Sequence, residues 1–156
     1  MTLSRQNLSI IIVSFLSEPV IYKCIDSIPS EIKIIVVDNS NNIQFKKELE
    51  LKYQNVECIL SSQNLGMGAG NNLGLKQVKT DFVLILNPDV ILNINTIDKL
   101  IEAADKIESF GIIAPISNSS KFPNFQLNKN QKKNEDEEIP FKVKSVDGCL
   151  LYTSPS

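Results

Sequence analysis

Two aspartates, each close behind a short apolar segment, are the residues of this sequence best suited to chemistry. Asp38 follows Ile32–Val37, and Asp89 lies three positions after Phe82–Leu86, with Asn87 between them. Mg²⁺ and Mn²⁺ commonly bind through one or two carboxylates together with substrate phosphates, so we expect Asp89 to hold a metal ion and Asn87 to add a neutral oxygen. Asp38 is placed to accept a hydrogen bond from the imide N–H of uracil or thymine. A single aspartate at such a position is often only a helix cap or a turn former, so the pair carries more weight than either one.

A glycine-rich stretch over residues 64–74 is the second candidate site. Glycines at positions 66, 68 and 70 leave backbone N–H groups uncovered just before a predicted helix, which favours a phosphate or a sugar hydroxyl. Asn64, Gly66 and Asn71 are the binding residues that we predict from this stretch. The alternative is a flexible turn that softens the start of the helix.

The same stretch does not match the dinucleotide-binding fingerprint. A G-x-G-x-x-G match would need glycine at position 71 or 73, where the chain has Asn71 and Leu73, and the stretch follows the third predicted strand instead of the first. The chain also has no Gly-Lys-Ser/Thr triplet of the Walker phosphate loop. A Rossmann-type oxidoreductase is therefore an alternative that the glycine spacing disfavours.

Composition narrows the chemistry further. The chain has no histidine, which excludes histidine bases and imidazole metal ligands from this segment. Its one arginine, Arg5, precedes the first predicted strand, so a divalent cation, Mn²⁺ or Mg²⁺, is expected to neutralise a bound diphosphate. A net charge of -2 and a pI of about 5.2 lack the basic footprint of a nucleic-acid-binding domain.

The cysteines and the apolar segments indicate the compartment. Cys24, Cys58 and Cys149 form no C-x-x-C pair, so neither a zinc ribbon nor a disulfide framework is predicted, and a reducing compartment fits best. The longest apolar candidate for a membrane span, Phe82–Leu92, is interrupted by polar residues and proline at 87–89. We therefore predict that this segment does not span the membrane. The predicted location is the cytoplasm, with the inner face of the membrane as an alternative.

Five short apolar segments and the sequences between them must position these residues. With 156 residues, 42% of them hydrophobic and 22% charged, the chain suits one globular core. The predicted strands are Ser9–Phe15, Ile32–Val37, Val56–Leu60, Phe82–Leu86 and Ile112–Ile116. The predicted helices are Val20–Ile28, Ile43–Lys52, Gly70–Val78 and Thr96–Ser109, the last with Asn95 or Thr96 as its N-cap and Gly111 at its end.

Continuous apolar strands that alternate with helices are typical of one fold class. Strands of this kind are buried on both faces, so we predict an α/β fold: a doubly wound, mostly parallel sheet with helices on both faces. Ligands bind such sheets outside the carboxyl ends of the strands, near the point where the strand order reverses. The residues directly after each strand are therefore the predicted binding region.

Four segments in this order resemble the family 2 glycosyltransferases of the GT-A fold. They are Ser9–Phe15, Ile35–Asn39, Asn64–Gly74 and Leu86–Val90. The similarity covers residues 8 to 116 well and 143 to 152 loosely, and it is greatest to the rhamnosyltransferase-like branch, in which Asn-Pro-Asp replaces the Asp-x-Asp metal motif. It implies transfer of a sugar from a nucleoside-diphosphate donor, UDP- or dTDP-linked, to an acceptor hydroxyl with inversion at the anomeric carbon. A glycan or lipid-linked acceptor in bacterial-type cell-envelope polysaccharide synthesis is the expected partner.

The resemblance also implies roles for individual residues. Asp38 would contact the nucleobase, and Asp89 would hold the metal ion on the diphosphate leaving group. Ser14, Phe15 and Glu18 would border the nucleotide pocket.

The chain departs from the family pattern at several positions. Phe15 and the residue after it stand where the family usually has Tyr-Asn, and Asn87 replaces the first carboxylate of the metal motif. The family's general base is a carboxylate beyond the strand that corresponds to Val143–Tyr152, and no residue of this chain matches it. Asp147 is the only carboxylate near that strand and is placed at a turn, so we leave the base unknown and expect it beyond Ser156.

The sequence divides into three predicted regions. Residues 1–116 form a nucleotide-sugar-binding α/β domain, 117–142 an exposed polar loop with the acidic run Glu135–Glu138, and 143–156 the truncated start of an acceptor-side region. We expect the chain to be the N-terminal portion of a longer enzyme. The alternative function is a catalytically incomplete GT-A-like module that only binds nucleotide.

Overall fold

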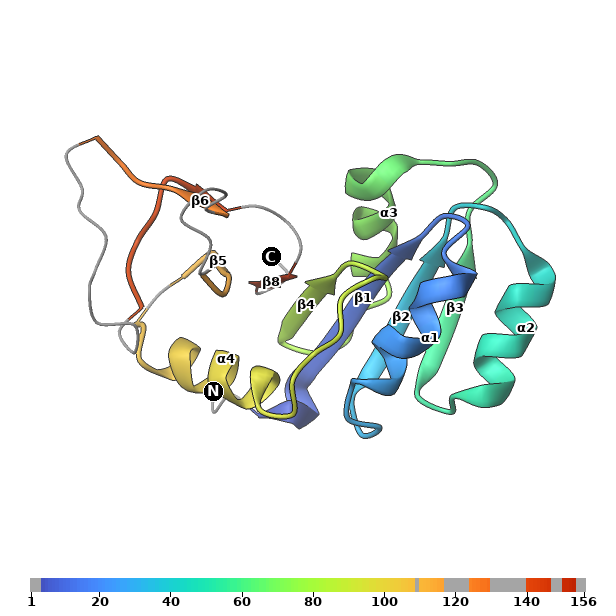
Figure 1. Ribbon diagram of the computed structural model, residues 1–156, viewed down its shortest axis with the longest axis horizontal. Helices are drawn as coiled ribbons and strands as arrows, with labels where there is room; N and C mark the ends of the chain where they lie inside the picture. The colour runs from blue at the N-terminus through green and yellow to red at the C-terminus, as the bar shows by residue number, and fades with distance from the viewer. Residues whose placement is uncertain (1–3, 109, 117–123, 130–139, 147–149, 154–156) are drawn as a thin grey trace.

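A computed structural model describes residues 4–108, 110–116, 124–129, 140–146 and 150–153 of the chain (Figure 1). A 3₁₀ turn, η1 (Arg5–Asn7), precedes the first strand. The helices are α1 (Glu18–Asp26), α2 (Ile43–Lys52), α3 (Gly66–Leu75) and α4 (Thr96–Asp105). The strands are β1 (Leu8–Ser14), β2 (Lys33–Asp38), β3 (Val56–Leu60), β4 (Phe82–Leu86), β5 (Ile112–Ile113), β6 (Phe125–Gln126), β7 (Ser145–Val146) and β8 (Leu150–Thr153).

Six of these strands form one sheet in the order β3-β2-β1-β4-β8-β5. Strands β1 to β4 are parallel, and β8 lies antiparallel between β4 and β5. Ser14 pairs with Asp38, and Ile12 pairs with Leu86, so the carboxyl ends of β1, β2 and β4 meet at one edge of the sheet. Strand order reverses between β1 and β4, because the chain builds outward to β3 and then returns past β1. The predicted doubly wound α/β fold is confirmed.

Alternate residues of β1 face two separate cores, because successive side chains of a strand point to opposite faces. Ile10 and Ile12 belong to the larger core, which contains buried residues of α1, α2 and α4. Ile11 belongs to a smaller core, against which Leu73 of α3 packs. Three helices therefore cover one face of the sheet and α3 covers the other, and α1 lies in front of the strands in Figure 1.

Two glycines let α3 pack closely on the sheet. A Cβ atom at Gly70 would lie 2.9 Å from Val13 Cγ1, and one at Gly74 would lie 2.9 Å from Ile11 Cγ2. Real Cβ atoms do not approach other atoms so closely, so both positions need glycine at the observed spacing of helix and sheet. Gly70 thereby fixes the distance between α3 and the end of β1.

The helix boundaries differ from the predicted ones at several ends. Helix α3 begins at Gly66, four residues before its predicted start. Helix α4 ends at Asp105 instead of Ser109, although its apolar periodicity continues to Ile107, because the chain turns there and the Ile107 N–H donates to the Ala104 carbonyl oxygen. The prediction that Gly111 ends this helix is therefore wrong.

The C-terminal strands are shorter than predicted. The strand expected over residues 112–116 covers only Ile112–Ile113. Within the described part of 143–152 lie β7, which pairs with β6, and β8, which pairs with β4 and β5. Most of the predicted polar loop, the acidic run Glu135–Glu138, Asp147 and Cys149 lie outside the described residues.

Cys24 and Cys58 are free thiols in the larger core. Burial raises the pKa of each to about 12, so both are protonated at neutral pH. No helix in the described part of the chain is long and apolar enough to cross a membrane.

Candidate functional site

A groove of about 450 Å³ opens where the strand order reverses, at the carboxyl ends of β1 and β4. This is the position at which open parallel sheets bind ligands. Residues after β1, β2, β3 and β4 all contribute to its walls. The lining residues are Val13, Phe15, Leu16, Ser17, Pro19, Val20, Asn39, Asn64, Gly66, Met67, Asn87, Pro88 and Asp89.

A tight turn after β4 presents Asp89 to this groove. The Val90 N–H donates to the Asn87 carbonyl oxygen (3.2 Å), and Pro88 occupies the second position, where its fixed φ favours such a turn. Asp89 is exposed and is the only charged side chain among the described residues that line the groove. Its carboxylate is therefore accessible to a cation.

The donor set around Asp89 fits a metal ion that arrives with its own oxygen ligands. The described residues contain no group of three or more His, Cys, Asp or Glu side chains that could hold a metal. One exposed carboxylate, with the Asn87 amide in the same wall, instead suits a cation whose remaining ligands are diphosphate oxygens and water.

The corner after β1 forms an apolar wall with unusual backbone geometry. Leu16 has a φ of 53°, in the left-handed region that large side chains rarely adopt. The Ser17 hydroxyl lies 3.2 Å from the Phe15 nitrogen and 3.3 Å from the Phe15 carbonyl oxygen, which closes this corner locally. The side chains of Phe15 and Leu16 are left 49% and 65% exposed.

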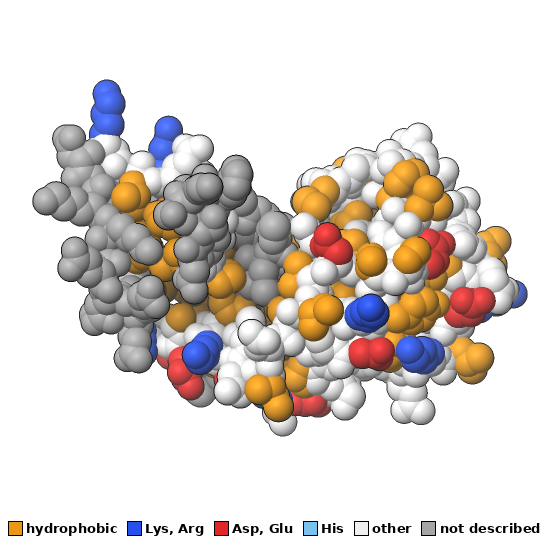
Figure 2. All heavy atoms as spheres, viewed as in Figure 1, with side chains coloured by type: hydrophobic (Ala, Val, Ile, Leu, Met, Phe, Trp, Pro, Cys, Tyr) orange, Lys and Arg blue, Asp and Glu red, His pale blue; other side chains and the backbone are white. Residues whose placement is uncertain are grey.

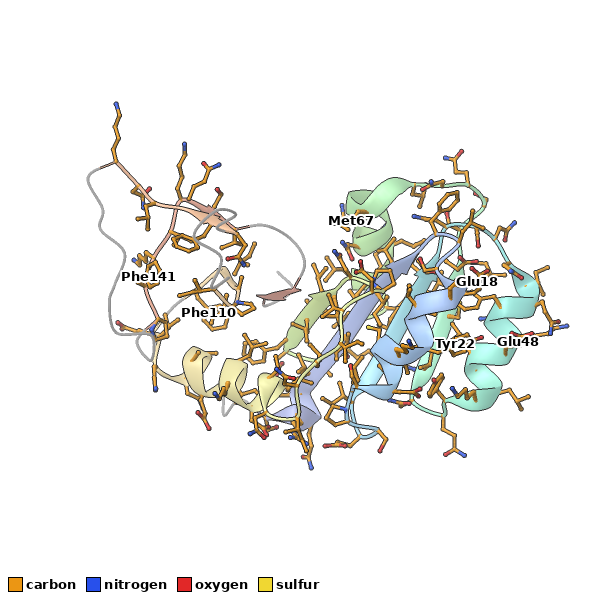
Figure 3. All side chains as sticks on the ribbon, viewed as in Figure 1. Glu18, Tyr22, Glu48, Met67, Phe110 and Phe141 are labelled. Carbon is orange, nitrogen blue, oxygen red and sulfur yellow. The ribbon has the colours of Figure 1, made fainter. Side chains whose placement is uncertain are left out.

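The start of α3 forms the facing wall. The Asn64 side-chain oxygen accepts a hydrogen bond from the Gly66 N–H (2.9 Å), and Gly66 has a φ of 73°, which glycine adopts readily. Leu65, the N-cap residue, has no side chain that can accept from the first-turn N–H groups. Met67 projects from this turn in Figure 3 and is 50% exposed.

Asp38 lies at the same edge of the sheet but does not line the groove. Its residue is fully buried, and one carboxylate oxygen accepts from the Ser40 N–H (3.2 Å) and the Ser40 hydroxyl (2.7 Å). The other oxygen accepts from the Asn42 N–H (2.8 Å). Both oxygens thus hold the turn that leads into α2.

Asn39, the next residue, is a lining residue that sequence analysis did not select. It is 3% exposed, and its amide nitrogen donates to the Gly66 carbonyl oxygen (3.3 Å). Its amide oxygen has no hydrogen-bond partner among the described residues. A buried acceptor without a partner is costly, so this oxygen is suited to a ligand N–H or O–H group. Its position just after the end of a predicted strand is the sequence feature that could have indicated this role.

The remaining predicted residues lie behind the groove or beside it. Ser14 is fully buried with its hydroxyl unpartnered among the described residues, and half-buried Asn71 has an unpartnered amide oxygen. Glu18 accepts from the Asn42 amide (3.1 Å) and lies at the α1–α2 side of the molecule in Figure 3. The groove brings together the other predicted residues, Phe15, Asn64, Gly66, Asn87 and Asp89.

Comparison with known proteins gives the family. The family model of Glycosyl transferase family 2 matches residues 9–150. The chain belongs to this family. A similar protein, the low-salt glycan biosynthesis hexosyltransferase Agl10 of Haloferax volcanii, is 31% identical over 113 residues, which cover 70% of this chain and 36% of Agl10.

Solved structures share the fold of this family 2 chain. S. aureus TarS in complex with UDP-GlcNAc has 26% identity and a TM-score of 0.54, covering 64% of this chain and 31% of TarS. The mannosyltransferase PcManGT from Pyrobaculum calidifontis, in complex with GDP-Man and Mn²⁺, has 12% identity and a TM-score of 0.68, covering 97% of this chain and 45% of PcManGT. The chain therefore spans less than half the length of each of these relatives.

Proposed function

We propose that the chain forms the donor-binding part of an inverting glycosyltransferase of family 2. It transfers a sugar from a nucleoside-diphosphate donor, UDP- or dTDP-linked, to the hydroxyl of a glycan or lipid-linked acceptor in cell-envelope polysaccharide synthesis. The observation that carries the proposal is the exposed Asp89 carboxylate, the one charge among the described residues that line a groove at the strand-order reversal. The Asn-Pro-Asp sequence at this turn supports the rhamnosyltransferase-like branch.

Each wall of the groove has a role in this reaction. Asp89, with Asn87, holds a divalent cation, Mn²⁺ or Mg²⁺, which supplies charge neutralisation to the nucleoside-diphosphate leaving group. Phe15 packs against the nucleobase and excludes water. The unpartnered Asn39 oxygen accepts a hydrogen bond from the bound nucleoside. Over α3, Figure 2 shows orange apolar side chains among white surface, and charged side chains are few there.

The proton of the acceptor hydroxyl is taken by a carboxylate from elsewhere in the protein. No second carboxylate lines the groove within the described residues, so Asp89 has no local partner for this task. Residues 1–116 are the nucleotide-sugar-binding unit in this proposal, and the enzyme works in the cytoplasm.

The proposal is tested by titrating the chain with UDP and with dTDP, with and without Mn²⁺, by calorimetry and thermal unfolding. A nucleotide at one hundred times its dissociation constant should stabilise the fold by about 2.7 kcal/mol. The variant Asp89→Asn should lose at least tenfold of the affinity measured with Mn²⁺ and keep the affinity measured without it.

Asp81→Asn is the matched control. Asp81 is an exposed aspartate directly before β4, at the opposite end of the same strand from Asp89. It should bind both nucleotides like the parent chain. No nucleotide binding at all, or equal Mn²⁺-dependent affinity in Asp89→Asn, would rule out the proposed site.

A catalytically incomplete nucleotide-binding module is the second candidate, favoured by the single carboxylate in the described groove. Such a module binds UDP but neither transfers nor hydrolyses a bound sugar. Release of UDP from UDP-sugars and of dTDP from dTDP-sugars, followed with the longest available chain of this protein, separates the two. If the parent chain releases nucleoside diphosphate faster than Asp89→Asn does, and only with a metal ion, the result supports a glycosyltransferase over a binding module.

A further inference from the structure

The position of Asp89 depends on the backbone of its turn. The described structure records no hydrogen bond or ion pair from the Asp89 carboxylate. The turn is short, and only the Val90-to-Asn87 hydrogen bond closes it from within. Whatever holds the neighbouring backbone therefore holds the carboxylate in the groove.

Cys24 of α1 and Ser27, the C-cap residue of this helix, contact this backbone on either side of Asp89. The Cys24 thiol donates to the Asn87 carbonyl oxygen across 3.6 Å, two residues before Asp89. The Ser27 hydroxyl accepts from the Leu92 N–H across 3.0 Å, three residues after it. The loop after β4 thus runs beside α1 and is attached to it at both ends.

The Ser27 hydroxyl is fixed in direction by a second contact. It donates a hydrogen bond to the Cys24 carbonyl oxygen (2.6 Å) and accepts one from the Leu92 N–H. One hydroxyl group therefore bonds both to the last turn of α1 and to the loop. Cys24 is fully buried, so water does not compete for its contact with the Asn87 carbonyl oxygen. Leu92 is 7% exposed and packs in the larger core, which anchors the far end of the loop.

The same helix also contributes to the groove. Pro19 and Val20, in the first turn of α1, are lining residues. Helix α1 therefore both lines the groove and contacts the loop that carries Asp89. A shift of the loop along α1 would move Asp89 relative to a ligand held by the other walls.

We propose that Ser27, with Cys24, is a positioning residue for metal-assisted nucleotide binding: it attaches the loop after β4 to α1 and holds Asp89 in register with the groove. The inference rests on the proposed function. Neither side chain lines the groove, so their effect on a ligand acts through the turn that carries Asn87 and Asp89.

The test compares Ser27→Ala, Ser27→Thr and Thr80→Val. Thr80 is the matched control: its hydroxyl lies 2.8 Å from the Ser9 hydroxyl and 2.9 Å from the Phe82 carbonyl oxygen, at the opposite end of β4. Urea unfolding, UDP affinity with and without Mn²⁺, and amide hydrogen exchange are measured for each variant.

We expect Ser27→Ala to weaken Mn²⁺-dependent UDP binding three- to tenfold and leave metal-free UDP binding unchanged. It should also increase exchange of the Val90 and Leu92 amides at least tenfold, because both depend on the attached loop. Ser27→Thr keeps the hydroxyl and should restore both measurements. Thr80→Val should be destabilised like Ser27→Ala yet bind UDP normally.

Two results would overturn the inference: parent-like exchange at both amides in Ser27→Ala, or an equal loss of Mn²⁺-dependent binding in Thr80→Val. Failure of the proposed function is recognised separately, by absence of Mn²⁺-dependent UDP binding in the parent chain. The exchange experiment needs no ligand, so it decides the attachment of the loop in that case too.

Discussion

The amino ends of the parallel strands form one edge of the sheet (the amino edge), and their carboxyl ends form the other (the carboxyl edge). The two edges differ in how completely their polar groups form hydrogen bonds. At the amino edge, Arg5 makes two charge-assisted hydrogen bonds to Asp98 (2.8 and 2.7 Å) and one to Glu31 (2.8 Å). The Thr80 hydroxyl lies within hydrogen-bond distance of two groups, and the Asn55 amide donates to the Ile32 carbonyl oxygen (2.8 Å). Apart from the local contact of Thr80 with Phe82, these contacts join chain segments that are 23 to 93 residues apart in sequence.

The carboxyl edge is built in the opposite way. Ser14 and Asn39 leave buried oxygens without partners among the described residues, and Leu16 carries a left-handed backbone. Phe15 and Met67 expose about half of their apolar side chains. The unpartnered oxygens and the left-handed backbone cost folding free energy at the edge where open parallel sheets bind ligands. The amino edge therefore stabilises the sheet, and the carboxyl edge keeps groups ready for a ligand.

The largest effect on this comparison is expected where α3 meets the carboxyl edge. Gly70→Ala should lower the free energy of unfolding by about 1 kcal/mol, because its Cβ would overlap Val13, a lining residue, by more than the helix gains from alanine. Gly68→Ala, with nothing within 4 Å of its Cβ, should raise it by about 0.5–1 kcal/mol. Urea unfolding of both variants measures the difference.

The pair isolates the contact between helix and sheet, since both glycines lie in α3 without positive φ. Gly70→Ala should also weaken UDP binding, whereas Gly68→Ala should not. Equal stabilities for the two variants would mean that α3 does not sit as closely on β1 as the structure has it.

The sequence predicts the fold well because the pattern that encodes it is local. The apolar segments over β1 to β4 leave little choice between strand and helix, and β3, β4 and α2 have the predicted boundaries. The start of α3 and the end of α4 differ from the prediction. Helix α4 ends in a local turn at Ala104–Ile107 although its apolar periodicity continues. The close packing of Gly70 and Gly74 on the sheet is a tertiary contact, which no periodicity in the sequence reports.

The groove could be predicted in part, because strand order gives its edge but not the direction of each side chain. Asp89 faces the groove since a proline-containing turn projects it outward. Asp38 turns inward to Ser40 and Asn42, and Asn39 faces the groove in its place. Asp38 and Asn39 are neighbours in the chain. The position of a strand end in the sequence does not tell which of the two side chains faces the groove. The contacts of Cys24 and Ser27 join segments 63 and 65 residues apart, and nothing in the sequence indicates them.

The next-largest effect concerns the amino edge and its dependence on pH. Hydrogen bonds from the Arg5 guanidinium lower the pKa of both Asp98 and Glu31 below their usual values. A carboxylate with a lowered folded-state pKa stabilises the fold above its unfolded pKa, about 4, and this contribution is lost as the pH falls through the folded-state pKa. Arg5→Ala should therefore reduce stability at pH 7, and the difference from the parent chain should shrink below pH 4.

Urea unfolding at pH 7 and pH 3 measures this difference. UDP affinity should not change in Arg5→Ala, since the residue lies at the edge away from the groove. If Arg5→Ala lost UDP binding and kept its stability, the amino edge would contribute to ligand binding, and the distinction between the two edges would be wrong.

The smallest effect is expected for a substitution of Leu16, which should raise the free energy of unfolding but lower the affinity for UDP. Leu16→Asn should raise the free energy of unfolding by about 0.5–1 kcal/mol, because asparagine tolerates the left-handed backbone that leucine does not. It should also weaken UDP binding, because it removes apolar surface from the groove wall. Asn41, with a φ of 55° and outside the groove lining, provides the reverse substitution: Asn41→Leu should lose similar stability and bind UDP normally. If Leu16→Asn stabilised the fold and bound UDP as tightly as the parent chain, the strain at this corner would serve no ligand. The carboxyl edge would then be less stable than the amino edge without a functional reason.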